Sequence, residues 1–182
     1  MALARLFGRK RHERAGFALY TSSVRAARDP YFYAELGVPD TMDGRFDMIG
    51  LHVCLLIERL MQEKPEGPAL AQALFDAMFS DMDHTLRELG VGDMSVGRKV
   101  KAMWEALHGR SQAYVAALEA GDHAALSASL ARNVWRGEAA GDGADQLARV
   151  AMARWDGLRQ QDLKSLMAGE VVFAPVTQVA PA

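Results

Sequence analysis

The chain has 182 residues, and half of them are hydrophobic, which is enough to bury the core of one domain. The charged fraction of 24% excludes wholesale disorder, and no apolar run approaches the roughly 20 residues of a membrane span. The single cysteine, Cys54, excludes an internal disulfide framework and a cysteine-ligated metal cluster. An intracellular, reducing compartment is therefore expected.

The net charge of −2 conceals an uneven distribution along the chain. Residues 1–28 carry a formal charge of +6, whereas residues 29–93 carry −9. This asymmetry predicts two surfaces with different partners. The acidic middle argues against DNA as a partner of the folded body.

Apolar side chains recur at helical spacing along most of the chain. In chain order we expect a helix over 12–28, a short helix that begins at Pro30, and a helix over 46–60. The next helix begins at Pro68 and has its C-cap at Gly90, and the one after it runs from an N-cap at Ser95 to about residue 118. The last two run from an N-cap at Asp122 to Val134 and over 144–167. Alternating strand patterns are missing. The sequence therefore predicts an all-α fold, with a basic head at 1–16, a single compact multi-helix domain at 17–168 and a short extended tail at 169–182.

The head alternates apolar residues with cations. Two interpretations stay open: a basic amphipathic segment that faces a membrane or the ribosome, and a solvated, disordered tail. The cations that carry the first interpretation are Arg5, Arg9, Lys10, Arg11 and Arg14.

Candidate metal ligands are few. Asp43 and Asp47 lie one turn apart at a predicted helix start, where helix capping is favoured over metal binding. Helical di-iron sites need the Glu-x-x-His motif on two helices, and the sequence holds one copy, Glu105 to His108. We therefore predict no metal site. The alternative that stays open is a metal- or haem-binding helical protein that uses His52, His84 or His108 with nearby carboxylates.

Catalytic motifs are also missing. Cys54 lies between apolar residues, where a cysteine is usually inert, and no nucleophile elbow, P-loop or dinucleotide fingerprint occurs. The sequence predicts neither an enzyme nor a cofactor nor a small-molecule substrate. Met78, Phe79 and Met82 mark a flexible apolar face, which suits either internal packing or the binding of a protein client.

Three long motifs resemble those of the ubiquinol–cytochrome c chaperone family. They are GVPDTMDGRFD at 37–47 followed by LHV at 51–53, LFDAMFSDMD at 74–83 with LRELGVGD at 86–93, and SVGRKVK at 95–101 with Gly109 and Arg110. The resemblance covers roughly residues 17–160. It implies an all-helical assembly factor that helps newly made cytochrome b into the ubiquinol–cytochrome c reductase complex.

That resemblance also sets expectations for partners and place. The client is cytochrome b or another integral membrane protein, and the protein lies in the cytoplasm at the inner membrane of a bacterium, or in the mitochondrial matrix of a eukaryote. The candidate partner surface consists of Asp40, Asp43, Asp47, His52, Met78, Asp81, Asp83, Arg87, Asp93, Arg98 and Lys99. A face around Met78 and Asp81 is expected to be exposed. The alternative is that half of the charged residues serve as caps and intramolecular ion pairs.

Overall fold

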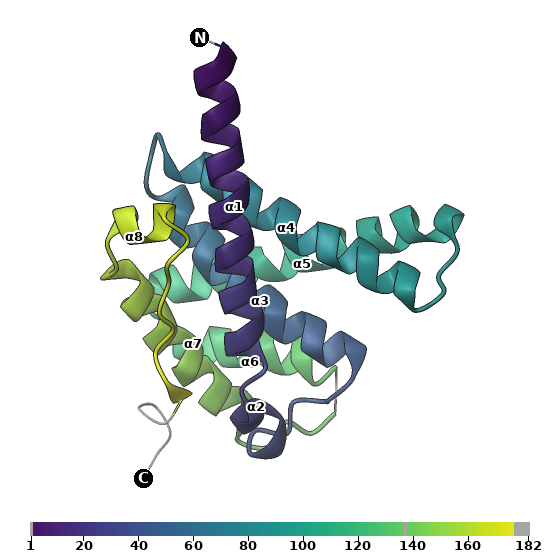
Figure 1. Cartoon of the computed structure of the whole chain (residues 1–182). Helices are drawn as coiled ribbons and strands as arrows, with labels where there is room; N and C mark the ends of the chain where they lie inside the picture. The colour runs from purple at the N-terminus through teal and green to yellow at the C-terminus, as the bar shows by residue number, and fades with distance from the viewer. Residues whose placement is uncertain (1, 137, 177–182) are drawn as a thin grey trace.

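The computed structural model describes residues 2–136 and 138–176, with side chains described from residue 10 onward. The helices are α1 (Ala2–Ala27), α2 (Pro30–Ala34), α3 (Met42–Met61), α4 (Gly67–Glu88), α5 (Asp93–Ala120), α6 (His123–Val134), α7 (Gly143–Arg159) and α8 (Leu163–Met167). Because the described residues contain helices and no strand, the prediction of an all-α fold is confirmed. Figure 1 shows their arrangement.

The central helix of the body is α3, which contacts α1, α4, α5, α6 and α7. Every residue from Phe46 to Leu56 is buried. A helix that is buried on all sides depends on its neighbours to keep its apolar surface from water. The helix predicted over 46–60 is confirmed and begins four residues earlier, at Met42.

α1 packs against α3 and α4, and Gly16 of α1 lies directly against the backbone of α4. A Cβ atom added there would lie 2.6 Å from the backbone carbonyl carbon of Ala73, so only glycine allows the two helices to meet at this distance. The N-terminal end of α1 projects beyond the body (Figure 1). The described backbone of the basic head is thus helical and continuous with a helix of the body.

The end of α4 and the beginning of α5 form a helical hairpin, residues 80–104, that projects from the side of the body (Figure 1). We call this hairpin the arm. Gly90 at its tip has a left-handed backbone (φ 79°), and its amide donates a hydrogen bond to the carbonyl of Arg87. The C-cap predicted at Gly90 is one residue late, because Leu89 is the C-cap residue of α4 and Gly90 follows it. Leu86 and Val96 are buried within the arm but lie outside the main core cluster.

Two helix starts test the predicted N-caps. The carboxylate of Asp122 accepts a hydrogen bond from the amide of Ala125 at 2.9 Å, which confirms Asp122 as the N-cap of α6. The prediction for α5 is wrong, because that helix begins at Asp93 with Gly92 as the cap residue, ahead of Ser95.

The single helix predicted over 144–167 is wrong at its C-terminal end. α7 ends at Arg159, and α8 begins separately at Leu163. Asp162 causes the new start, since its carboxylate accepts a hydrogen bond from the amide of Ser165 at 3.2 Å.

After α8, residues 170–175 form neither helix nor strand. The side chain of Gln161 holds this segment by accepting from the amide of Val172 at 2.9 Å and donating to its carbonyl at 2.7 Å. Of the tail predicted at 169–182, residues 177–182 lie outside the described residues.

Candidate functional site

The first motif forms the turn into α3. Thr41 is the N-cap, because its hydroxyl accepts a hydrogen bond from the amide of Gly44 at 3.1 Å. A side chain at position 44 would collide with the carbonyl oxygen of Pro39, so the turn requires glycine there. The expectation that Asp43 or Asp47 caps this helix is wrong, since both carboxylates bind arginines instead.

Asp47 is the centre of an ion-pair network that joins three parts of the chain. Its fully buried carboxylate pairs with Arg110 of α5 and, at 2.9 Å, with Arg136, which follows α6. Arg136 also pairs with Asp43 at 2.5 Å. Burial raises the pKa of Asp47, and the two guanidinium groups oppose that shift. The backbone of Arg136 is left-handed (φ 52°), an unfavourable conformation for arginine that these ion pairs help to hold.

Three further predicted acids also have partners within the chain. Asp40 pairs with Arg45 at 2.6 Å, and this hydrogen bond lowers the pKa of Asp40. At the tip of the arm, Arg87 pairs with both Asp83 and Asp93, and its hydrogen bond lowers the pKa of Asp83. These carboxylates therefore serve intramolecular ion pairs at two separate places, not one continuous surface.

A separate groove between α1 and α4, of about 540 Å³, contains the remaining predicted acid. There the hydroxyl of Tyr20 donates to Asp81 at 2.6 Å, and Asp76 and Glu13 also line the groove. The predicted acids thus lie in three regions of the molecule. The groove is acidic, and it is separate from the network around Asp47.

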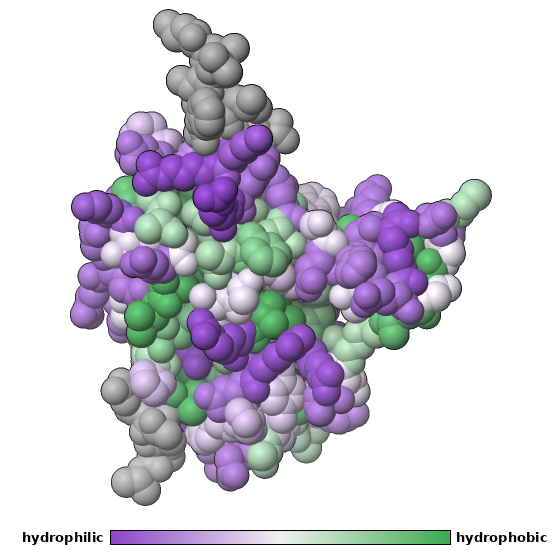
Figure 2. Space-filling view, in the orientation of Figure 1, coloured by the Kyte–Doolittle hydropathy of each residue, from purple (hydrophilic) through white to green (hydrophobic). Residues whose placement is uncertain are grey.

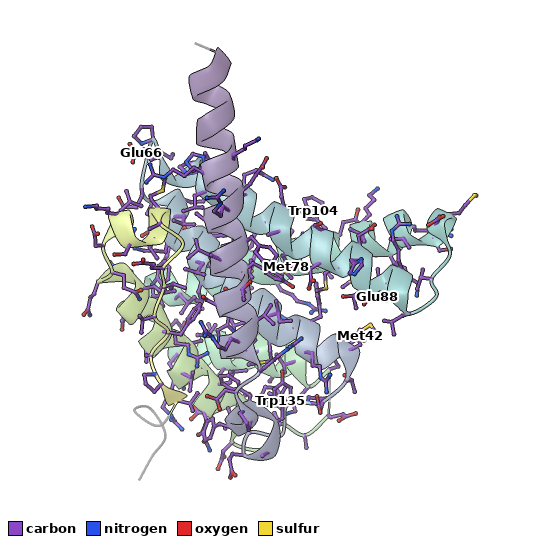
Figure 3. The ribbon with its side chains drawn as sticks, viewed as in Figure 1. Met42, Glu66, Met78, Glu88, Trp104 and Trp135 are labelled. Carbon is purple, nitrogen blue, oxygen red and sulfur yellow. The ribbon has the colours of Figure 1, made fainter. Side chains whose placement is uncertain are left out.

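Three predicted partner residues are not on the surface. Met78 on α4, labelled in Figure 3, is fully buried, so the expected exposed face around it is wrong. His52 is buried against Arg154, and Asp47 is buried in its network. A helical pattern indicates which residues share a face, and it does not indicate which of two apolar faces meets the core.

The predicted cations of the arm differ from one another, since Arg87 pairs with Asp83 and Asp93 whereas the two predicted cations on α5 pair with no described residue. Arg98 and Lys99 are exposed on α5, and neither forms an ion pair with any described residue. Lys10, Arg11 and Arg14 are exposed on α1, and together they line a groove of about 420 Å³ against α8. The side chains of Arg5 and Arg9 lie outside the described residues.

A third groove lies between the start of α3 and the underside of the arm. It has a volume of about 360 Å³ and an apolar lining that includes Met42, Phe46, Leu86 and Met103. Arg110 and Arg136 of the Asp47 network form its inner end. We call it the arm groove.

Sequence reasoning did not identify the arm groove. The available signal was the spacing of Lys99, Met103, Ala106 and Arg110, which recur at three or four residues on one face of a predicted helix. The position of Met42 across the groove follows only from the fold (Figure 3).

The three histidines of the metal-binding alternative each have a different partner within the chain. His84 pairs with Glu88 at 3.1 Å, and His108 stacks on Trp104 with ring centroids 5.4 Å apart. His52 is buried between Arg154 and the carbonyl of Met48. Within the described part of the chain, no group of three metal-ligating side chains converges, so the structure gives this alternative no support.

Comparison with known proteins identifies the family of this chain. The family model described as "Ubiquinol-cytochrome C chaperone" matches residues 34–173, which is more than half of the chain. The chain belongs to this family. Its members are assembly chaperones and not enzymes.

Relatives extend the likeness beyond the motifs. The ubiquinol-cytochrome-c reductase complex assembly factor 1 of Xenopus laevis is 24% identical over 90% of this chain and 82% of its own length. The mouse protein of that name is 25% identical over 92% of this chain, which spans only 57% of the mouse protein. The crystal structure of the Cbp3 homolog from Brucella abortus matches 99% of this chain and 100% of its own, with 40% identity and a TM-score of 0.85.

None of the helices in residues 2–136 and 138–176 combines the length and the apolar character that crossing a membrane demands.

Proposed function

We propose that this protein is an assembly chaperone that binds cytochrome b, a hydrophobic membrane-protein client, and assists biogenesis of the ubiquinol–cytochrome c reductase complex. The observation that carries the proposal is the family match over residues 34–173, supported by a fold match along nearly the whole chain. The arm groove agrees with this role, because flexible methionine side chains suit an apolar partner.

Deletion of the gene in its own host tests the role. We expect loss of the assembled reductase complex on native gels and loss of the cytochrome b absorbance in membranes. Re-expression of the wild-type chain should restore both. A deletion strain with normal amounts of the complex would refute the proposal.

Affinity capture tests the client. The tagged protein, purified from membranes in mild detergent, should carry cytochrome b, and a strain that cannot make cytochrome b serves as the control. Recovery of other subunits alone would assign the protein to a later step of assembly and refute cytochrome b as its client.

We further propose that the protein works in the cytoplasm at the inner membrane of a bacterium, or in the matrix of a mitochondrion. The exposed cations Lys10, Arg11 and Arg14 support contact of α1 with the membrane or the ribosome, since both are strongly anionic. Flotation with anionic and with neutral vesicles, and sedimentation with ribosomes, distinguish the two surfaces. A triple exchange of these cations for glutamine should abolish the interaction that occurs.

The exposed charged residues of the predicted partner surface remain part of the proposal. Charge reversal at Asp81, Asp83 and Arg98, one at a time, should reveal which region meets the partner. Asp81 lines the acidic groove, whereas Asp83 pairs with Arg87 near the tip of the arm and Arg98 is exposed on α5. Their separate effects on captured cytochrome b therefore distinguish the groove from the outer part of the arm. Equal capture by all three variants would place the partner surface elsewhere.

A further inference from the structure

The walls of the arm groove come from two helices. One of its walls is a single face of α5, from Lys99 through Met103 to Arg110, and the start of α3 with Met42 forms the other. Lys99 and Arg110 are eleven residues apart, which corresponds to about 16 Å, or three helical turns. A wall of this kind presents ridges and grooves to a second helix.

The lining is apolar and adaptable. Met42 is 51% exposed although it lines the groove, and Met103 is only half-buried. Between them, Ala102 and Ala106 are exposed and leave room for a partner to approach the backbone of α5 closely. Exposed apolar side chains around a groove are typical of a protein-binding surface. Figure 2 shows green, hydrophobic side chains among purple, hydrophilic ones on the projecting arm.

The charge of the groove is polarised. At the inner end, Arg110 and Arg136 are neutralised by Asp47 and Asp43. At the outer end, Lys99 has no carboxylate partner among the described residues. The exposed Arg98 beside it adds a second positive charge. An occupant with a carboxylate at the outer end would therefore be favoured, and one with a cation there would be repelled.

We propose that the arm groove binds one apolar α-helix of the client, with a carboxylate of that helix against Lys99. The proposal rests on the chaperone function proposed above and names the part of the client that is held. A helix is favoured over an extended strand, because the described residues offer no sheet edge to which a strand could add. Complementary charges at one end fix the direction in which the helix lies.

Site-specific photo-crosslinking in the host tests the groove. The photoreactive residue p-benzoylphenylalanine replaces Met103, and the matched control carries it at the next residue, Trp104, which faces a different cavity beside Cys54. We expect position 103 to crosslink to an apolar helical segment of cytochrome b that contains a carboxylate, at least about tenfold more than position 104. Equal yields from both positions, or crosslinks from 103 only to a second copy of this chain or to water-soluble proteins, would overturn the proposal.

A charge exchange tests the direction. Lys99→Glu should reduce captured cytochrome b about fivefold, the effect of losing one exposed ion pair. The control Lys101→Glu changes the same charge at an exposed site that pairs with Glu105 outside the groove, and it should leave capture unchanged. Replacement of the crosslinked client carboxylate by lysine should restore capture by Lys99→Glu. Equal losses in both variants, or no restoration, would overturn the orientation.

The two proposals fail in different ways. If the wild-type chain captures cytochrome b but position 103 does not crosslink to it, the groove assignment is wrong and the chaperone function stands. If the deletion strain assembles the complex normally, the chaperone function is wrong and the groove loses its occupant. Thermal unfolding of Lys99→Glu, which changes an exposed side chain, should match that of the wild type.

Discussion

Arg154 donates a hydrogen bond from Nη1 to Nε2 of His52 inside the core, where neither residue is more than 3% exposed. The other ring nitrogen, Nδ1, donates to the carbonyl of Met48 at 2.7 Å, which fixes a neutral tautomer. The guanidinium lies over the rings of Phe32 and Phe173, at 5.1 and 5.7 Å from their centroids. The pair thereby joins α3 and α7 to the C-terminal segment.

We expect this pair to make folding stability depend on pH. Burial and the charge of Arg154 lower the pKa of His52 from 6.5 to about 3. The contribution of neutral His52 to the free energy of unfolding is complete above the unfolded-state pKa of 6.5 and is lost as the pH falls toward 3. Over this range the unfolded chain binds a proton at His52 that the folded chain does not bind. Between neutral pH and pH 5 the loss is about 2 kcal/mol. Urea unfolding at both pH values measures it.

His52→Gln is the matched comparison, because glutamine can accept from Arg154 and donate to Met48 without titrating. The pH dependence of the wild type should exceed that of the variant. Should the variant not fold, the imidazole resonance of His52 gives a second measurement. Its titration above pH 5 in the native protein would contradict the prediction.

Removal of the Asp47 carboxylate should destabilise the fold strongly. Asp47→Ala leaves Arg110 and Arg136 without their buried partner, and we expect a loss of about 3 kcal/mol in the free energy of unfolding. Asp43→Ala removes a carboxylate that is 68% exposed and should cost less than about 1 kcal/mol. Denaturant unfolding of both variants compares them. Equal losses would mean that the network does not depend on burial.

The apolar spacing predicted most helices because a helical face is a local property of the sequence. It located the helix over 46–60 and placed the C-cap of α4 one residue late, at Gly90. It also extended the last long helix past Asp162, although an aspartate there is itself a helix-start signal. The apolar pattern simply continued across that break. The spacing of apolar residues does not reveal a short non-helical connection when the apolar residues on both sides of it keep the same spacing.

The ion-pair network around Asp47 was less predictable than the helices, because the residues that pair in it are distant in sequence. Arg110 and Arg136 are 63 and 89 residues from Asp47, and no spacing rule connects them. Met78 shows the complementary difficulty, since buried and client-facing methionines share one pattern. The cations of α5 were found because they are adjacent, whereas the apolar wall opposite them depends on how α3 packs against the arm.

Adding one methyl group at Gly16, where α1 crosses α4, should destabilise the protein. Gly16→Ala would force the α1 backbone away from Ala73, and we expect a loss of about 1–3 kcal/mol in unfolding free energy. The control is Gly109→Ala in α5, where an added Cβ meets nothing within 4 Å. That change should stabilise the protein by about 0.5–1 kcal/mol, since alanine favours helix. Stabilisation by both substitutions would contradict the close crossing.

The thiol of Cys54 should be nearly inert in the folded protein. Burial raises its pKa from 9.0 to about 12, a shift that a hydrogen bond with Ser111 only partly opposes. Because the thiolate is the reacting species, a rise of this size lowers the thiolate fraction, and with it the labelling rate near pH 8, about a thousandfold. A chromogenic disulfide reagent measures the rate, with the chain in concentrated urea as control. A cavity of about 130 Å³ lies beside Cys54 under Trp104, so rapid labelling under native conditions would mean that this cavity opens to reagents and would contradict the prediction.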